Sequence, residues 1–125
     1  MNTFKRQKTS HHPEVILDAE SGVFEINGRS LPEQVLKLYD PILEWIEEYT
    51  LVPHEQTILK INLDYVNSSS TKYLLEILKK LNVYFNEGNK VLVKWYFDEY
   101  DEDCEESGEE YAELLDLEFE LIQKK

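Results

Sequence analysis

The chain has 125 residues, of which 42% are hydrophobic and 12% aromatic. This length predicts one domain, and the composition supplies enough apolar material for a hydrophobic core. The formal net charge is −13, from 26 acidic and 13 basic residues. Nucleic acids and anionic membranes bind basic surfaces, so this charge argues against both and favours solubility or a protein partner with a basic face.

Cysteine content and hydropathy indicate the compartment. Cys104 is the single cysteine, so no internal disulfide can form, which is typical of a reducing cytosol. No stretch approaches the ~18 consecutive apolar residues of a membrane helix. The basic residues near the N-terminus are not followed by the apolar run of a signal peptide. We therefore expect a cytoplasmic protein.

Residues 1–12 are polar and basic, and we expect a flexible N-terminal arm there, followed by a single domain over residues 13–125. His11 and His12 are adjacent in this arm. Neighbouring side chains of an extended chain point apart, so the pair predicts a solvated tail rather than a metal site.

The first part of the domain predicts a hairpin and a helix. Residues 15–18 and 23–26 each have the pattern of a short strand, and Gly22 suits the turn between them because it tolerates a positive φ. Residues 33–49 place apolar side chains on one helical face. Pro41 lies inside this pattern and lacks a backbone donor, which predicts a kink or a division of the helix.

The middle of the chain predicts a strand, a helix and a second strand. Residues 57–65 alternate between apolar and polar side chains, and the apolar spacing that follows indicates a helix ending near Gly88. Residues 91–97 are almost all apolar or aromatic, as in a buried strand. Such a unit implies two parallel strands joined by a right-handed crossover.

Asn67 and four consecutive hydroxyl residues, at 68–71, lie between the central strand and its helix. They can form a capped turn with surplus serines, because Asn and Ser are preferred helix N-caps. They can also form a phosphorylation site, because the start of a helix favours added negative charge. Ser69 and Lys72 fit the S-x-x-K spacing of serine acyl-enzymes, but the chain lacks the other motifs of those enzymes.

Residues 98–113 form an acidic segment, in which ten of sixteen residues are Asp or Glu. Asp101 and Asp103 fit the start of a calcium-binding EF-hand loop, but Glu106 stands where that loop needs Gly. We therefore predict a solvated acidic helix without a metal, then a last strand over residues 117–121. The whole pattern predicts an α/β fold, with a mixed sheet of about five strands and the order β-β-α-β-α-β-α-β.

Several of these stretches resemble the SiaC family of bacterial regulatory phosphoproteins, which have a STAS-like fold. The resemblance spans residues 13–122 and is carried by residues 20–22, 39–49 and 65–72, and by the Trp-Tyr-Phe-Asp-Glu run at 95–99 that leads into acidic residues 101–103. It implies a non-enzymatic protein that has no catalytic residue, no cofactor and no small-molecule substrate.

The resemblance also implies a switch controlled by phosphorylation. In this family a dedicated kinase of the histidine-kinase-like ATPase type phosphorylates a hydroxyl residue just after the Asn of the turn. A metal-dependent serine/threonine phosphatase removes the phosphate. The unmodified form binds and activates a diguanylate cyclase, which raises cyclic di-GMP and favours biofilm formation. Carried over to this chain, the phosphosite is Ser68, where family members usually have Thr.

The other hydroxyl residues of the run are alternative phosphate acceptors, namely Ser69, Ser70 and Thr71. Asn67 and Lys72 would support the turn. Two other functions stay open, namely a constitutive STAS-like interaction module and an anti-anti-sigma-type regulator, both without phosphorylation. The acidic segment either aids solubility or steers a basic partner toward aromatic anchors nearby. The residues predicted for this partner surface are Trp95, Tyr96, Tyr100, Asp101, Glu102 and Asp103.

Overall fold

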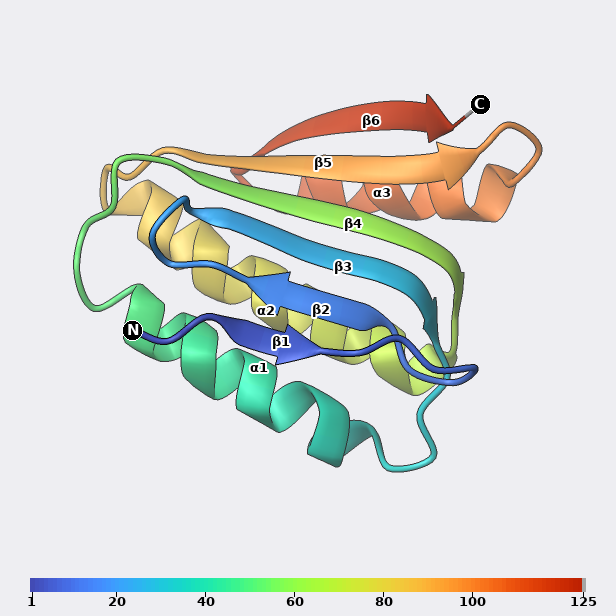
Figure 1. The fold of residues 1–125 in the computed structure, drawn as a ribbon. Helices are drawn as coiled ribbons and strands as arrows, with labels where there is room; N and C mark the ends of the chain where they lie inside the picture. Colours follow the sequence, from blue (N-terminus) through green and yellow to red (C-terminus); the bar gives the residue numbers. More distant parts are fainter. Residues whose placement is uncertain (125) are drawn as a thin grey trace.

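The predicted alternation of strands and helices is present in the computed structural model, which describes residues 1–124 (Figure 1). Six strands and three helices follow one another along the chain. Their bounds are β1 Phe4–Arg6, β2 Glu14–Leu17, β3 Val23–Ser30, α1 Val35–Tyr49, β4 Thr57–Val66, α2 Ser68–Asn86, β5 Val91–Asp98, α3 Glu102–Leu114 and β6 Glu118–Lys124.

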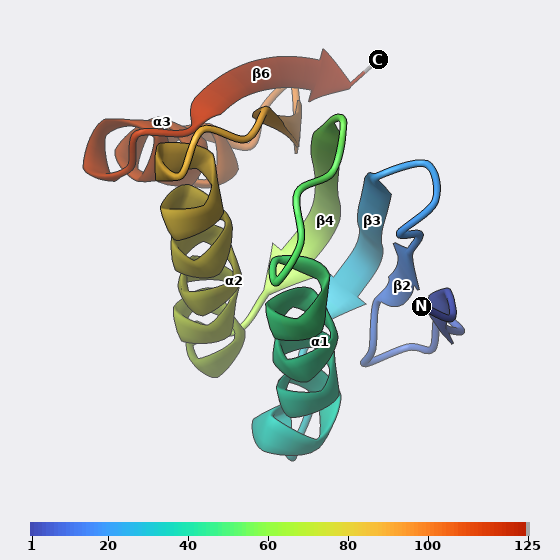
Figure 2. The same ribbon diagram turned by 90° about the vertical axis from the view of Figure 1, so that its left-hand side faces the viewer.

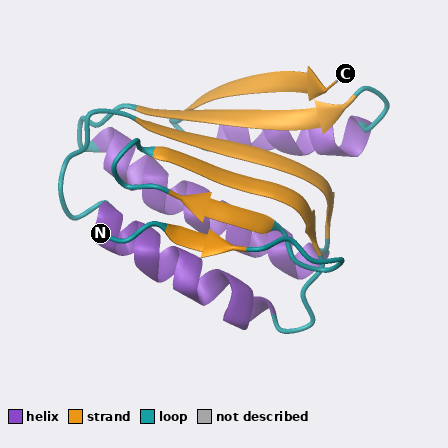
Figure 3. Cartoon of the chain, in the orientation of Figure 1, coloured by secondary structure: helices purple, strands orange, loops and turns teal. Residues whose placement is uncertain are grey.

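The six strands form one mixed sheet in which each strand lies beside its neighbour in the sequence. β1, β2 and β3 pair antiparallel, whereas β3 to β6 pair parallel. Each parallel pair is joined by one helix, and crossovers of the same hand place all three helices on one face of the sheet (Figures 2 and 3). The mixed sheet, its covering helices and the order of elements confirm the predicted fold class.

The strand that was not predicted is β1, which lies in the segment predicted as a flexible arm. Phe4 pairs with Leu17 and Arg6 with Val15, and the Phe4 side chain packs against the core. Residues 4–6 show no strand pattern, because a three-residue edge strand needs only one inward apolar side chain. The sheet therefore starts before residue 13, while Lys125, the last residue of the predicted domain, lies outside the described residues.

Helix α1 continues through Pro41, so of the two predicted outcomes, a kink or a division, the division does not occur. Pro41 removes one backbone donor, but the apolar stripe of α1 holds the helix against the sheet on both sides of it. The buried residues of this stripe are Leu38, Tyr39, Ile42, Ile46 and Tyr49.

Among residues 1–124, no helix has the length and apolar character needed to cross a bilayer.

Two glycines with positive φ allow a test of the β2–β3 hairpin. Gly22 has φ +74°, and a Cβ there would collide with the backbone carbonyl oxygen of Gln56, whereas Gly88 has φ +103° with open space around it. We expect Gly88→Ala to lower the free energy of unfolding by about 1 kcal/mol, and Gly22→Ala by about 3 kcal/mol because of the added collision. Equal losses in urea unfolding would contradict this account of the hairpin.

Candidate functional site

The hydroxyl turn lies where the carboxyl ends of β3 and β4 meet. The backbone N–H of Asn67 donates to the carbonyl oxygen of Ser30, the last residue of β3, at 2.9 Å. Helices α1 and α2 both start at this edge of the sheet. In open α/β sheets the carboxyl ends of parallel strands form the usual site of function, because loops and helix N-termini gather there.

Asn67 is the N-cap of α2. Its backbone is extended, with φ −80° and ψ 166°, and its side-chain oxygen accepts from the backbone N–H of Ser70 at 2.9 Å. The Ser69 hydroxyl donates to the same oxygen at 3.3 Å, and the Thr71 hydroxyl donates to the Asn67 carbonyl oxygen at 3.1 Å. This cap fixes the start of the helix at Ser68 and thereby the direction of every following side chain.

The helical register separates the hydroxyl residues. Successive side chains rotate by about 100°, so residues 68 and 70 point in nearly opposite directions. Ser68 is exposed and Ser69 half-buried, whereas Ser70 has 0% exposure. Thr71 is exposed, one residue further along the helix. A protein kinase can therefore reach Ser68 in the folded protein but cannot reach Ser70.

Ser70 belongs to a buried chain of hydroxyl groups. Ser30 Oγ lies 2.7 Å from the Tyr39 hydroxyl and donates to Ser70 Oγ at 2.8 Å, and Ser70 Oγ donates to the Ser30 carbonyl oxygen at 3.3 Å. Burial raises the pKa of the Tyr39 hydroxyl above its ordinary value, against the smaller opposing effect of its serine hydrogen bonds. A neutral Tyr39 hydroxyl thus helps hold the end of β3, α1 and the first turn of α2 together.

Lys72 is exposed on α2, one turn beyond Ser68. Residues 68 and 72 are four apart and so are neighbours on the helix surface. The Ser69 hydroxyl donates to Asn67 rather than to a base, so the S-x-x-K spacing does not form an acyl-enzyme site. Among residues 1–124 no group of three or more His, Cys, Asp or Glu side chains could hold a metal ion.

The acidic segment forms a helix, as predicted, and the structure shows that this helix is capped. Asp101 is the N-cap of α3 and accepts from the backbone N–H of Cys104 at 3.1 Å. Glu102, Asp103 and Glu105 lie in the first turn, where the helix dipole favours negative charge. Part of this acidic sequence therefore stabilises α3 directly.

The predicted aromatic anchors differ in their exposure. Trp95 is only 4% exposed, and its indole N–H donates to the Cys104 carbonyl oxygen at 2.9 Å, so it is a core residue rather than a surface anchor. Its place on β5, facing α3, explains this burial. Tyr96 is half-buried, and Tyr100 is 89% exposed in the turn before α3. Tyr100 is thus the aromatic residue that a partner can reach most easily.

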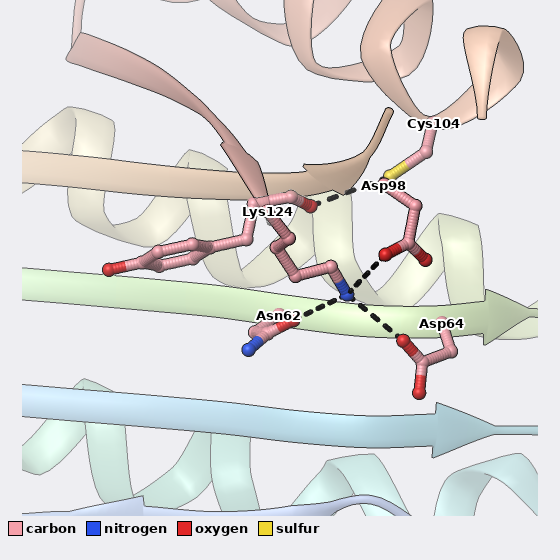
Figure 4. Close-up of polar contacts among 6 residues, drawn as sticks. Asn62, Asp64, Asp98, Cys104 and Lys124 are labelled. Atoms are coloured by element: carbon pink, nitrogen blue, oxygen red, sulfur yellow. Dashed lines mark hydrogen bonds and ion pairs between the residues drawn. The ribbon is translucent and has the colours of Figure 1, made fainter. Parts of the chain in front are cut away.

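Lys124 makes a contact that the sequence did not suggest. Its Nζ donates to Asn62 Oδ1 at 2.8 Å and to Asp64 Oδ1 at 2.9 Å, and lies 3.7 Å from Asp98 Oδ1 (Figure 4). The side chain crosses from β6 over β5 to β4, on the face of the sheet that carries no helix. It offsets the charge of two carboxylates and ties the last strand to the strand that leads into the hydroxyl turn.

The different positions of Ser68 and Ser70 lead to a stability prediction. We expect Ser70→Ala to lower the free energy of unfolding by about 1–3 kcal/mol, because it removes two buried hydrogen bonds, those of Ser70 Oγ with Ser30 Oγ and with the Ser30 carbonyl oxygen. The exposed Ser68→Ala variant should change it by less than ~0.5 kcal/mol. Urea unfolding of the two variants measures both values, and a larger loss for Ser68→Ala would show that the helix register is wrong.

Comparisons with known proteins agree with this geometry. The family of SiaC regulatory phosphoproteins matches residues 6–124. An uncharacterized protein of Pseudomonas aeruginosa (strain UCBPP-PA14) is 27% identical over 113 residues, which cover 90% of each chain. The solved structure of SiaC of Pseudomonas aeruginosa has a TM-score of 0.91 at 24% identity, and the match covers 99% of this chain and 100% of that one.

A second solved structure contains SiaC of Pseudomonas aeruginosa in complex with the diguanylate cyclase SiaD, of which that SiaC is the activator. This match has a TM-score of 0.91 at 26% identity, and it covers 97% of this chain and 99% of that one. Both structures share the sheet and helices described above. The present chain belongs to the SiaC family of regulatory phosphoproteins, which are non-enzymatic regulators.

Proposed function

We propose that this protein is a partner-switching module in which reversible phosphorylation of Ser68 controls binding to a signalling enzyme. The observation that supports this most is the separation of hydroxyls at the start of α2. Ser68 is exposed at the first position of the helix, while Ser70 is buried and the Thr71 hydroxyl donates to the Asn67 carbonyl oxygen. Ser68 is therefore the hydroxyl best placed for a kinase.

A phosphate on Ser68 changes the surface rather than the fold. It adds nearly two negative charges, which the positive end of the α2 dipole favours, and exposed Lys72 one turn along offsets part of them. The Ser30 and Ser70 hydroxyls are buried and do not lie on the surface that would carry this charge. The added charge acts on a protein whose formal net charge is already −13, so it repels an acidic partner surface and resists burial under an apolar one.

The partner proposed here is a diguanylate cyclase, because the similar SiaC of Pseudomonas aeruginosa activates the diguanylate cyclase SiaD. In this proposal the unphosphorylated protein binds and activates the cyclase, which raises cyclic di-GMP and favours biofilm formation. A cognate kinase of the histidine-kinase-like ATPase type adds the phosphate, and a metal-dependent phosphatase removes it, all in the cytoplasm. A constitutive interaction module would instead always show its unmodified mass, without the gain of about 80 Da that one phosphate brings.

Substitutions at Ser68 test the switch. We expect Ser68→Ala to bind the partner as the unmodified protein does and to resist inactivation by the kinase. Ser68→Asp should bind more weakly, because a carboxylate supplies part of the phosphate charge. Thr71→Ala is the matched control, because it removes an exposed hydroxyl from the same turn and should remain switchable. Phosphopeptide mapping after kinase treatment that finds phosphate only on Ser69, Ser70 or Thr71 would contradict the assignment.

The acidic segment allows a kinetic test. If the field around residues 101–103 steers a basic partner surface, association should slow as salt rises from about 0.05 to 0.5 M, which shortens the screening length roughly threefold. Replacing Asp101, Glu102 and Asp103 by Asn, Gln and Asn should lower the association rate with little change in dissociation. Asn at 101 still caps α3, so the fold is kept.

The control for this test has the same change of charge on α1, with Gln in place of the exposed residues Glu44, Glu47 and Glu48. It should change the association rate less, because it lies away from the proposed partner surface. Stopped-flow or surface-plasmon measurements give both rate constants. If the association rate did not depend on salt, or fell equally in both triple variants, the acidic segment would serve solubility only.

A further inference from the structure

A cavity of about 480 Å³ lies between the segment that follows β1 and the N-terminal end of α1. Arg6 of β1 and Lys37 of α1 line it from opposite elements, and His11 and His12 line it from the β1–β2 connection. Figure 1 shows this connection and the start of α1 at the same end of the molecule. The cavity lies outside the hydroxyl turn, and neither the resemblance nor the proposed switch uses it.

The charge of this cavity opposes that of the protein. Arg6 and Lys37 bring two positive charges to it, and Glu33 is the one carboxylate among the residues that line it. The whole chain has 26 acidic residues against 13 Lys and Arg, and two of its three histidines lie here. A local excess of positive charge in such an acidic protein favours an anion as the ligand.

Contacts within the protein hold the segments that line the cavity. The Arg6 guanidinium lies 5.2 Å from the centre of the Phe4 ring, in a cation–π contact. The carbonyl oxygen of His11 accepts from the backbone N–H of Leu31 at 2.9 Å, which ties the connection to the segment before α1. The His12 backbone N–H donates to the Thr9 hydroxyl at 2.9 Å. These contacts hold the backbone of the connection in place, while the side chains of Arg6, His11 and His12 are exposed.

The start of α1 also favours an anionic ligand in the cavity. Its N-cap residue, Gln34, makes no side-chain hydrogen bond to the first-turn amides, and that turn contains no acidic residue. The positive end of the α1 dipole thus carries no offsetting acidic charge from its own first turn. Lys37 lies in this turn and lines the cavity, so helix and side chain attract an anion to one place.

We propose that this cavity binds a small phosphomonoester, that is, a phosphate group attached to a compact polar body. Arg6 and Lys37 hold the phosphate, because a guanidinium and an ammonium form charge-assisted hydrogen bonds with its oxygens. The Glu33 carboxylate and the Gln34 amide remain for hydroxyl groups on the body of the ligand, and Leu38 covers its apolar side. The volume lies in the range of about 300–1,000 Å³ that small-molecule sites occupy.

The test uses NMR spectra of the unmodified, ¹⁵N-labelled full chain titrated with glucose 6-phosphate, AMP, inorganic phosphate and glucose. We expect saturable shifts of the backbone amides of residues 35–38 and of the His11 and His12 rings with at least one phosphomonoester. Inorganic phosphate should bind at least tenfold more weakly, and glucose should cause no shift. The Arg6→Gln/Lys37→Gln variant should lose at least tenfold in affinity while it keeps its thermal unfolding midpoint.

The matched control is Lys79→Gln/Lys80→Gln, which makes the same change of charge on α2 outside the cavity and should bind as the parent does. An equal loss in both double variants would show unspecific charge attraction and overturn the proposal. The proposal would also be overturned if neither phosphomonoester caused saturable shifts. It would be overturned as well if inorganic phosphate bound as tightly as both phosphomonoesters. Tighter binding of a peptide of residues 63–73 phosphorylated at Ser68 would assign the cavity to a protein segment instead.

Discussion

The cap that Asn67 forms on α2 is the interaction on which the geometry of the site depends. One hydrogen bond, from the Ser70 backbone N–H to the Asn67 side chain, sets the residue at which the helix begins. From that residue the helical rotation turns Ser68 outward and Ser70 inward. A start one residue later would turn every hydroxyl of the run by about 100° and exchange accessible positions for buried ones. The cap therefore selects which hydroxyl a modifying enzyme can reach.

The sheet supplies the rigid frame for this turn. Parallel pairing of β3 with β4 brings Ser30 beside Asn67, and the buried hydroxyls of Ser30, Ser70 and Tyr39 join the two helix starts. Lys124 ties β6 to β4 from the helix-free face. In the proposed switch, a charge added at Ser68 would lie on a turn that these buried hydrogen bonds hold in place, so we expect its main effect to be on the partner.

Local patterns predicted most of the fold, because alternation and helical spacing both record which face of an element is buried. They failed where a position depended on a distant element. β1 forms only by pairing with β2, and Trp95 is buried because α3 packs against it. The Lys124 side chain contacts residues of β4 and β5, which are distant in the sequence. Within the turn, the sequence indicated Asn67 and the hydroxyl run, but the burial of Ser70 depended on packing against Ser30 and α1.

The most direct test of the proposed switch uses the protein with phosphoserine incorporated only at position 68. Calorimetry measures the affinity of the proposed diguanylate cyclase partner for this protein and for the unmodified protein. A homogeneous phosphoserine carries the full charge, which an Asp substitution does not. The account predicts that the phosphorylated protein binds at least tenfold more weakly, with an unchanged thermal unfolding midpoint. Equal or tighter binding of the phosphorylated protein would contradict it.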